Sequence, residues 1–186
     1  MKRTAAALAL AAALGCIPRA TFVPTESPYE NREGEFTVDL PEGWMRVNSD
    51  QAVVVTRDGL ALQRIFIGRH ELGKPLKNSK RTIAAGMDPH EIAEALTGEF
   101  SSNEGLTGVQ IQENSPAKVS GARGLKIVFA YKDSDGLRMR SVFYGVLAKS
   151  GLWYVGYAAP ARHYFSADLA TFEKVVRSFK LAAPDA

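Results

Sequence analysis

Three apolar segments separated by only four or five residues constrain the fold of this chain most strongly. They cover residues 125–131, 137–147 and 152–158. Large apolar side chains recur at every second position of the first and at most such positions of the second, which is the period of a β-strand. Residues 133–136 (DSDG) and 149–151 (KSG) supply turn-forming residues between the segments. Successive strands joined by such short turns predict an antiparallel meander.

Other strand-like segments occur on the N-terminal side of this meander. Asp58-Gly59 lies between two of them and predicts a hairpin, because Gly readily adopts the positive φ that a type I′ turn requires. Residues 72–87 are irregular and basic, which predicts a surface loop, and Asn114-Ser115-Pro116 predicts an interruption after a further strand. We predict these strands at residues 36–40, 44–47, 53–56, 60–69 and 109–112.

Two amphipathic helices complete the predicted elements. Asp88 is a favourable N-cap, Pro89 suits the first helical position, and Glu91 stands where a capping box requires a Glu. The second helix covers residues 165–179, with large apolar residues every three or four positions and basic residues towards its C-terminal end. The fold class predicted is therefore α+β, with an antiparallel sheet flanked by helices on both faces.

The N-terminus has the parts of a secretory signal. Residues 1–3 (MKR) are basic, residues 5–14 contain only Ala and Leu, and Gly15 precedes Cys16, the single cysteine. The apolar run is too short to span a bilayer, which takes about 20 residues, but it fits a signal-peptide core. A small residue before the cysteine resembles the lipobox of bacterial lipoproteins. That resemblance implies removal of residues 1–15 and lipid attachment at Cys16.

A different processing site is the alternative. The lipobox family prefers Leu three residues before the cysteine, where this chain has Ala13. Cleavage after Ala13 by the ordinary signal peptidase would leave Cys16 as a free thiol. Acylation, in contrast, would anchor the chain stably, because each buried CH₂ contributes about 0.8 kcal/mol and two acyl chains suffice. Ile17 follows Cys16 in place of Asp, which by resemblance to Gram-negative lipoproteins favours the periplasmic face of the outer membrane.

The rest of the chain divides into a tether, one domain and a tail. Residues 16–35 contain three prolines and show no strand or helix period, so we predict an extended tether. We predict the folded domain at residues 36–181 and a disordered tail at residues 182–186.

Several local phrases resemble the PsbP-like family. They are residues 36–44 (FTVDLPEGW), residues 56–60 (TRDGL), the meander positions Tyr131, Gly136 and Tyr144-Gly145, and residues 164–179. This family includes the extrinsic PsbP subunit of photosystem II and shares its α/β/α sandwich with a Ran-binding nucleotide-release factor. The resemblance covers residues 35–181 and implies that sandwich. It also implies a non-catalytic binding, assembly or accessory role, which is typical of the family.

Motifs for catalysis are incomplete. Residues 90–94 (HEIAE) begin like a zinc-protease helix, but Glu94 stands where the second His is required. Residues 133–136 begin like a calcium loop but lack the third oxygen ligand and the Glu at position twelve. The chain contains neither a Gly-x-Ser-x-Gly elbow nor a phosphate-binding loop. We therefore predict a protein that is not an enzyme, with no catalytic residue, metal site or cofactor.

Aromatic residues are frequent in the meander. Aromatic side chains favour strands and cores, so we expect them to pack inside the domain. A groove for a ligand or partner beneath part of the sheet is the alternative. The residues concerned are Tyr131, Tyr144, Trp153, Tyr154 and Tyr157.

The net charge argues against nucleic acid as a partner. The whole chain has a formal charge of +3, and loss of residues 1–15 would remove Lys2 and Arg3 and leave +1. A charge near zero gives no electrostatic footprint for a polyanion. Two classes of function remain. The first is a membrane-anchored envelope lipoprotein that serves as a binding or accessory module for a protein partner. The second is a periplasmic small-ligand carrier or a tethered hydrolase.

Overall fold

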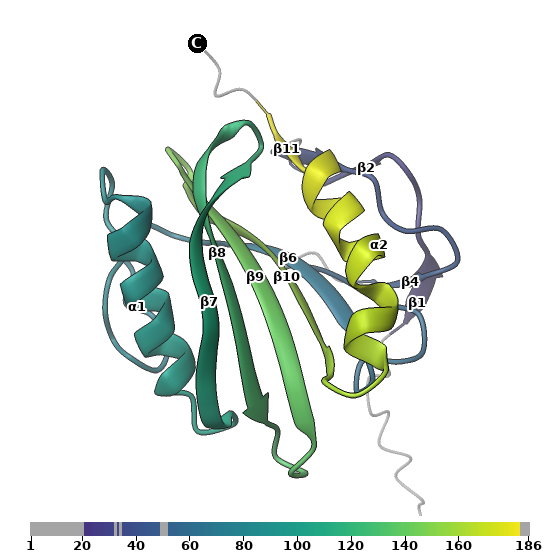
Figure 1. The fold of residues 1–186 in the computed structure, drawn as a ribbon. Helices are drawn as coiled ribbons and strands as arrows, with labels where there is room; N and C mark the ends of the chain where they lie inside the picture. Colours follow the sequence, from purple (N-terminus) through teal and green to yellow (C-terminus); the bar gives the residue numbers. More distant parts are fainter. Residues whose placement is uncertain (1–20, 32, 34, 49–51, 183–186) are drawn as a thin grey trace, which may run out of the picture.

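The computed structural model describes residues 21–31, 33, 35–48 and 52–182. Over these residues the chain forms a large antiparallel sheet of eight strands, a small sheet of three strands and two helices (Figure 1). The predicted α+β class with a large antiparallel sheet is confirmed. None of the helices in these residues is long and apolar enough to cross a membrane.

The large sheet has a simple order, with the short N-terminal strands at one end and the long strands at the other. Its strands are, in spatial order, β1 (Phe22–Pro24), β4 (Met45–Val47), β5 (Val53–Thr56), β6 (Arg64–His70), β10 (Gly151–Pro160), β9 (Arg138–Ala148), β8 (Ala122–Lys132) and β7 (Thr107–Val119). The small sheet contains β11 (Lys180–Leu181), β3 (Phe36–Val38) and β2 (Tyr29–Glu30), and the helices are α1 (Pro89–Ser101) and α2 (Tyr164–Ser178).

The meander prediction is confirmed for β8, β9 and β10, and β7 extends it by one strand. Each pairs antiparallel with its neighbour along nearly its full length. One expectation is wrong: β7 is not interrupted at Asn114-Ser115-Pro116 but continues through it, with register shifts earlier in the strand. Pro116 is tolerated because β7 is an edge strand of the large sheet. One side of an edge strand forms no ladder hydrogen bonds, so a proline, which lacks the N–H, fits there.

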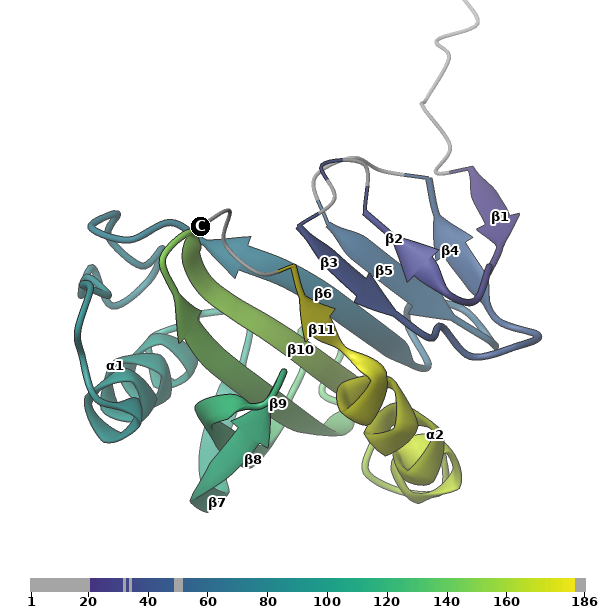
Figure 2. The same cartoon turned by 90° about the horizontal axis from the view of Figure 1, so that it is seen from above.

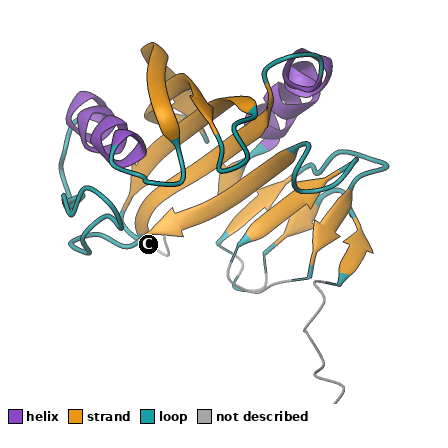
Figure 3. Ribbon diagram, turned by 90° about the horizontal axis from the view of Figure 1, so that it is seen from below, coloured by secondary structure: helices purple, strands orange, loops and turns teal. Residues whose placement is uncertain are grey.

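Alternate residues of the meander pack into two separate cores, because successive side chains of a strand point to opposite faces. Phe143 lies in one core with Ile92 and Leu96 of α1, and its neighbour Tyr144 lies in the other with Phe172 of α2. The two helices lie far apart on either side of the long strands (Figure 1 and Figure 3). The core that contains α2 also receives β3 of the small sheet, which lies across β5 and β6 (Figure 2).

Both helices begin within one residue of their predicted positions. At the start of α1, the backbone N–H of Asp88 donates to the Glu91 carboxylate at 2.8 Å, which is the return bond of a capping box. The apolar stripe of α2 is buried as expected, with Phe172 fully inaccessible to solvent.

A buried carboxylate fastens α2 to the turn between β5 and β6. Asp168 is only 3% exposed and accepts hydrogen bonds from the Arg57 guanidinium, at 2.9 Å, and from the Gln63 side-chain amide. The Thr56 hydroxyl donates to the Gln63 carbonyl at 2.7 Å in the same turn. Because these residues turn the chain, β6 begins at Arg64 and not at residue 60 as predicted.

The predicted tether over residues 16–35 is wrong for much of its length. Val23 pairs with Arg46 in the large sheet and Tyr29 pairs with Val38 in the small one. Pro24 ends an edge strand, a position where a proline costs no ladder hydrogen bond. The folded domain therefore includes β1 and β2, on the N-terminal side of the predicted boundary at residue 36. Cys16 and residues 183–186 of the predicted tail lie outside the described residues.

Candidate functional site

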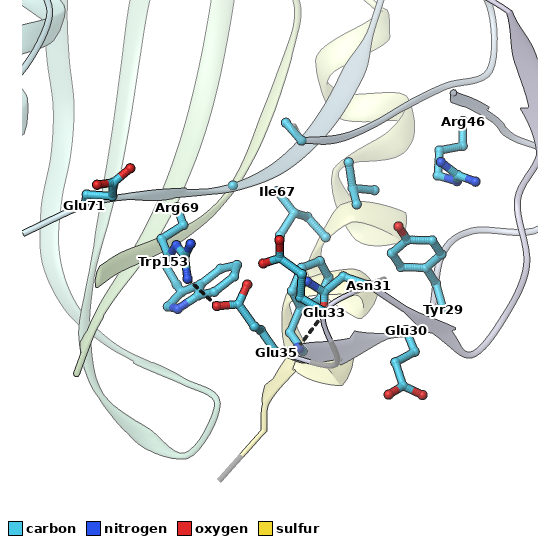
Figure 4. A pocket seen from close by; sticks show the side chains of 14 residues that line it. Tyr29, Glu30, Asn31, Glu33, Glu35, Arg46, Ile67, Arg69, Glu71 and Trp153 are labelled. Carbon is cyan, nitrogen blue, oxygen red and sulfur yellow. Dashed lines mark hydrogen bonds and ion pairs between the residues drawn. The ribbon is translucent and has the colours of Figure 1, made fainter. Parts of the chain in front are cut away.

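A cleft of about 630 Å³ opens between the small sheet and the short-strand end of the large sheet (Figure 4). Its walls come from segments that are far apart in the sequence, which the two sheets bring together. The lining residues are Tyr29, Glu30, Asn31, Glu33, Glu35, Phe36, Arg46, Ala52, Val53, Ile67, Gly68, Arg69, Glu71 and Trp153.

Local structure fixes both walls of the cleft. On β6, Ile67 and Arg69 lie on the same face because strand side chains alternate. On the opposite wall, the backbone N–H of Phe36 donates to Asn31 Oδ1 at 2.9 Å, and the N–H of Asn31 donates to the Phe36 carbonyl at 3.2 Å. This pair of hydrogen bonds closes the loop that contributes Glu33 and Glu35 to the lining.

Aromatic rings form the floor. Phe36 and Trp153 meet edge to face with ring centroids 5.4 Å apart, and both are only 4% exposed. The indole N–H of Trp153 donates a hydrogen bond to the Ser150 hydroxyl at 2.9 Å, which orients the ring. Such a rigid floor holds the polar groups above it in place.

Each arginine of the cleft lies over an aromatic ring. The guanidinium carbon of Arg46 is 5.2 Å from the Tyr29 ring centroid, and that of Arg69 is 5.3 Å from the Trp153 ring centroid. Both distances fall within the range of cation–π attraction. Arg69 also forms an ion pair with Glu35 across the cleft (Figure 4).

Among the described lining residues, the carboxylates outnumber the arginines. Burial is the main cause that raises the pKa of Glu35 above its ordinary value, and a hydrogen bond with Glu33 raises it further, while the charge of Arg69 opposes both. Glu30 and Glu71 are exposed at the rim. The described part of the lining is therefore acidic and polar, which suits the recognition of cationic groups.

The lining residues that the structure describes include no Ser, Cys, His or Lys. The groups they do offer are carboxylates, guanidinium groups, one amide and aromatic rings. These groups can bind and orient a charged partner through hydrogen bonds, ion pairs and stacking.

All five meander aromatics pack in the two cores, as expected, and Trp153 alone of the five also lines the cleft. Tyr157 stacks between Phe165 and Phe172, with centroids about 5.5 Å apart. The Tyr144 hydroxyl donates to the Glu173 carboxylate at 3.0 Å, and burial and this bond raise the pKa of Tyr144.

The residues of the incomplete motifs lie in ordinary structural settings. His90 is exposed on α1 and lies 3.4 Å from Glu94 one turn later. Asp133 accepts hydrogen bonds from the N–H groups of Asp135 and Leu137 and so closes the β8–β9 turn. Within the described ranges, no three His, Cys, Asp or Glu side chains are placed to hold a metal ion.

The sequence alone did not point to Arg46, Arg69 or Glu35. A signal for Arg69 exists, because it follows Ile65 and Ile67 at every second position of a strand whose apolar residues are buried. A charged residue at the next such position indicates that this face of the strand is no longer covered by the core there. Glu35 gave no such signal, since it lies in a segment predicted to be a tether.

Comparison with known proteins finds similarity in fold. No family model matches the chain, and no curated protein matches its sequence. The solution structure of cyanobacterial PsbP (CyanoP) from Synechocystis sp. PCC 6803 has a TM-score of 0.57 and 13% identity, over 90% of this chain and 96% of that one.

Two further solved structures share this architecture. The Ran-binding protein Mog1p of Saccharomyces cerevisiae has a TM-score of 0.53 and 11% identity, over 88% of this chain and 95% of its own. LpqN, which is involved in cell envelope biogenesis of Mycobacterium tuberculosis, has a TM-score of 0.52 and 13% identity, over 88% of this chain and 91% of its own. The predicted PsbP-like fold is thus confirmed, while identities this low show the fold alone.

Proposed function

We propose that this protein is an envelope lipoprotein, anchored through acylated Cys16, whose domain is a non-catalytic binding or accessory module for a protein partner. The observation that carries the proposal is the open cleft with its acidic lining and its two arginine–aromatic pairs. A cleft whose described lining holds four glutamates and two arginines fits a charged protein segment with basic side chains.

The polar lining favours a protein partner over a small apolar ligand. Pockets for small ligands are mostly apolar, with a few placed polar groups, and they enclose most of the ligand. Here the polar groups stand on both walls and the rim residues Glu30 and Glu71 are exposed. The volume of about 630 Å³ is within the range of ligand pockets, so a periplasmic small-ligand carrier is the second candidate.

The cellular placement rests on the N-terminal pattern. The basic start, the Ala/Leu run and Gly15-Cys16 support lipid anchoring, and Ile17 after the cysteine favours the periplasmic face of the outer membrane. The envelope role stated for LpqN, which has a similar fold, is compatible with this placement. We also infer the full α/β/α layering, because α1 and α2 join cores formed by alternate residues of the same strands.

Photo-crosslinking in intact envelopes tests the partner. A photoreactive residue at Glu30, on the rim of the cleft, should give a discrete protein adduct, and the same residue at exposed Glu104 should not. Glu71→Lys should weaken the adduct because it reverses a charge of the lining, whereas Lys118→Glu should leave it unchanged. If both positions give the same adducts, the cleft is not the binding site. A small molecule that co-purifies with the protein, without any adduct, would support the carrier.

Detergent-phase partitioning tests the anchor. The natural chain should partition into the detergent phase, and Cys16→Ser should move it to the aqueous phase because the site of acylation is lost. A Cys16→Ser chain that still partitions into detergent would contradict anchoring through this residue.

A further inference from the structure

One face of the large sheet carries a row of apolar residues at its short-strand end. Phe22 of β1 is paired with Val47 of β4, and Val54 of β5 is paired with Phe66 of β6. Met45 and Val47 are two residues apart in β4, so they lie on the same face. Met45 pairs with Thr56, which is two residues from Val54 in β5, so Val54 lies on this face too. We call Phe22, Met45, Val47, Val54 and Phe66 the apolar face.

This apolar face is incompletely covered by the described residues. Phe66 is at the margin of the core that contains α1, while the other four belong to neither core. Phe22 is 42% exposed, and Met45, Val47 and Val54 are half-buried. Figure 2 shows the reason, since β1, β4 and β5 lie at the end of the large sheet away from α1. On the opposite face of the same strands, Val53 and Val55 are buried.

The position of Cys16 indicates what covers the apolar face. Phe22 comes only six positions after Cys16, so the two lie at most about 20 Å apart. An acyl anchor on Cys16 would therefore hold this end of the sheet beside the bilayer. Aromatic and aliphatic side chains that reach a membrane surface enter the boundary between headgroups and acyl chains.

The charges around the apolar face suit a phospholipid surface. Positions of β1, β4, β5 and β6 on this face include Arg64 and His70 but no Asp or Glu. A carboxylate in this row would have to lose its hydration at the membrane, which is costly. The face can therefore approach anionic headgroups without repulsion.

We infer that the apolar face lies against the phospholipid surface to which Cys16 anchors the chain. This inference rests on the proposed lipid anchor. Cleft residues Val53 and Ile67 alternate with Val54 and Phe66, so they lie on the opposite face of the sheet. The bilayer thus orients the domain so that the acidic cleft opens away from the membrane, where a protein partner reaches it.

Fluorescence from two matched positions tests the inference. Phe22 and Leu137 are exposed to nearly the same extent, at 42% and 44%, but Leu137 lies at the β8–β9 turn, outside the apolar face. The acylated full chain would carry Phe22→Cys or Leu137→Cys as its sole free thiol, labelled with an environment-sensitive dye. Each protein would be reconstituted into vesicles of phosphatidylethanolamine and phosphatidylglycerol containing a lipid-borne quencher.

The dye at position 22 should shift its emission to the blue and be quenched several-fold more strongly than the dye at position 137. Equal quenching at the two positions, in protein that floats with the vesicles, overturns the membrane-facing surface and leaves the anchor intact. A blue shift at position 22 without lipid quenching overturns it in favour of a protein interface. Protein that fails to float with the vesicles overturns the anchor and this inference together.

Oxidation of methionine supplies a measurement on the unlabelled chain. Met45 belongs to the apolar face and Met87 lies in the loop before α1, and both are half-buried. The vesicles should slow sulfoxide formation at Met45 relative to Met87, compared with the Cys16→Ser chain in buffer. An unchanged ratio of the two rates contradicts the inference.

Discussion

The two ends of the large sheet differ in how completely they are buried. Strands β7–β10 are 10–13 residues long, and both helices pack on them. Strands β1, β4 and β5 are three or four residues long, and the cleft and the apolar face both belong to this end. The long-strand end is built as a core, while the short-strand end leaves polar and apolar groups available for contacts outside the chain.

The difference teaches where stability and recognition reside. Large buried side chains supply most of the free energy of folding, and fully buried Tyr157 and Phe172 lie where α2 packs on the meander. Recognition requires groups that are fixed but not fully covered, as Arg46 and Arg69 are over their aromatic rings. Substitutions at the two ends should therefore have opposite consequences for stability and for binding.

The largest effect is expected at Phe172, which is fully buried between Tyr144 and Tyr157. Phe172→Ala should lower the free energy of unfolding by about 3–5 kcal/mol, because it removes a large side chain and leaves a cavity. Urea denaturation measures this loss. At the short-strand end, Phe22→Ala should change stability by no more than about 0.5 kcal/mol, since Phe22 is exposed. Equal losses of unfolding free energy in the two variants would contradict the proposed difference between the two ends of the sheet.

The next effect is expected where the two ends are tied together at Asp168. Asp168→Ala should cost about 1–3 kcal/mol, because it leaves the buried Gln63 amide without its acceptor and removes the ion pair between Arg57 and α2. Asp168→Asn keeps an acceptor oxygen and should cost less. Thermal unfolding of both variants gives the comparison. A melting temperature that is unchanged in Asp168→Ala would show that this tie adds nothing to stability.

A glycine pair in the meander tests how tightly the long strands pack. A Cβ on Gly124 would lie 2.3 Å from the carbonyl oxygen of Gly145, whereas a Cβ on Gly145 would lie at an ordinary 3.4 Å from Leu125. Gly124→Ala should therefore cost about 1–3 kcal/mol, because the backbone must shift, and Gly145→Ala should cost less. Chemical denaturation of the two variants checks the difference. The reverse order would contradict the close approach of β8 to β9.

The smallest effect concerns two carboxyl groups, one at each end. The pKa of Glu35 in the cleft is raised, mainly by burial. For Glu99 at the α1 end, burial would raise the pKa, but hydrogen bonds from Ser79 and Asn78 outweigh it and the pKa is lowered. Glu35 should thus destabilise the fold as pH rises above its ordinary value of 4.5. Glu99 should lose its stabilising contribution as pH falls below that value.

Side-chain carbon chemical shifts measure both groups in one NMR titration. Glu35 should titrate above pH 4.5 and Glu99 below it. Glu33→Gln should lower the pKa of Glu35 without moving that of Glu99, because only Glu35 interacts with Glu33. Titration of both groups at the same pH would refute the contrast between the two ends.

The sequence predicted the long-strand end better than the short one. Alternation over residues 125–158 and the apolar stripe of α2 gave the meander and its covering helix, because long periodic segments are dominated by burial on one face. The short strands β1 and β2 gave no period over two or three residues, and their prolines suggested a tether. The cleft could not be predicted, since Glu35, Arg69 and Trp153 meet only through the pairing of β3, β6 and β10 with distant partners.

Mass spectrometry of the mature protein, purified from bacterial envelopes, tests the central claim most directly. That claim is that a lipid on Cys16 holds the short-strand end of the sheet at the membrane. We predict an N-terminal peptide that begins at Cys16 and carries the mass of acyl chains. A chain that begins at Leu14, with an unmodified thiol at Cys16, would contradict both the anchor and the orientation of the cleft.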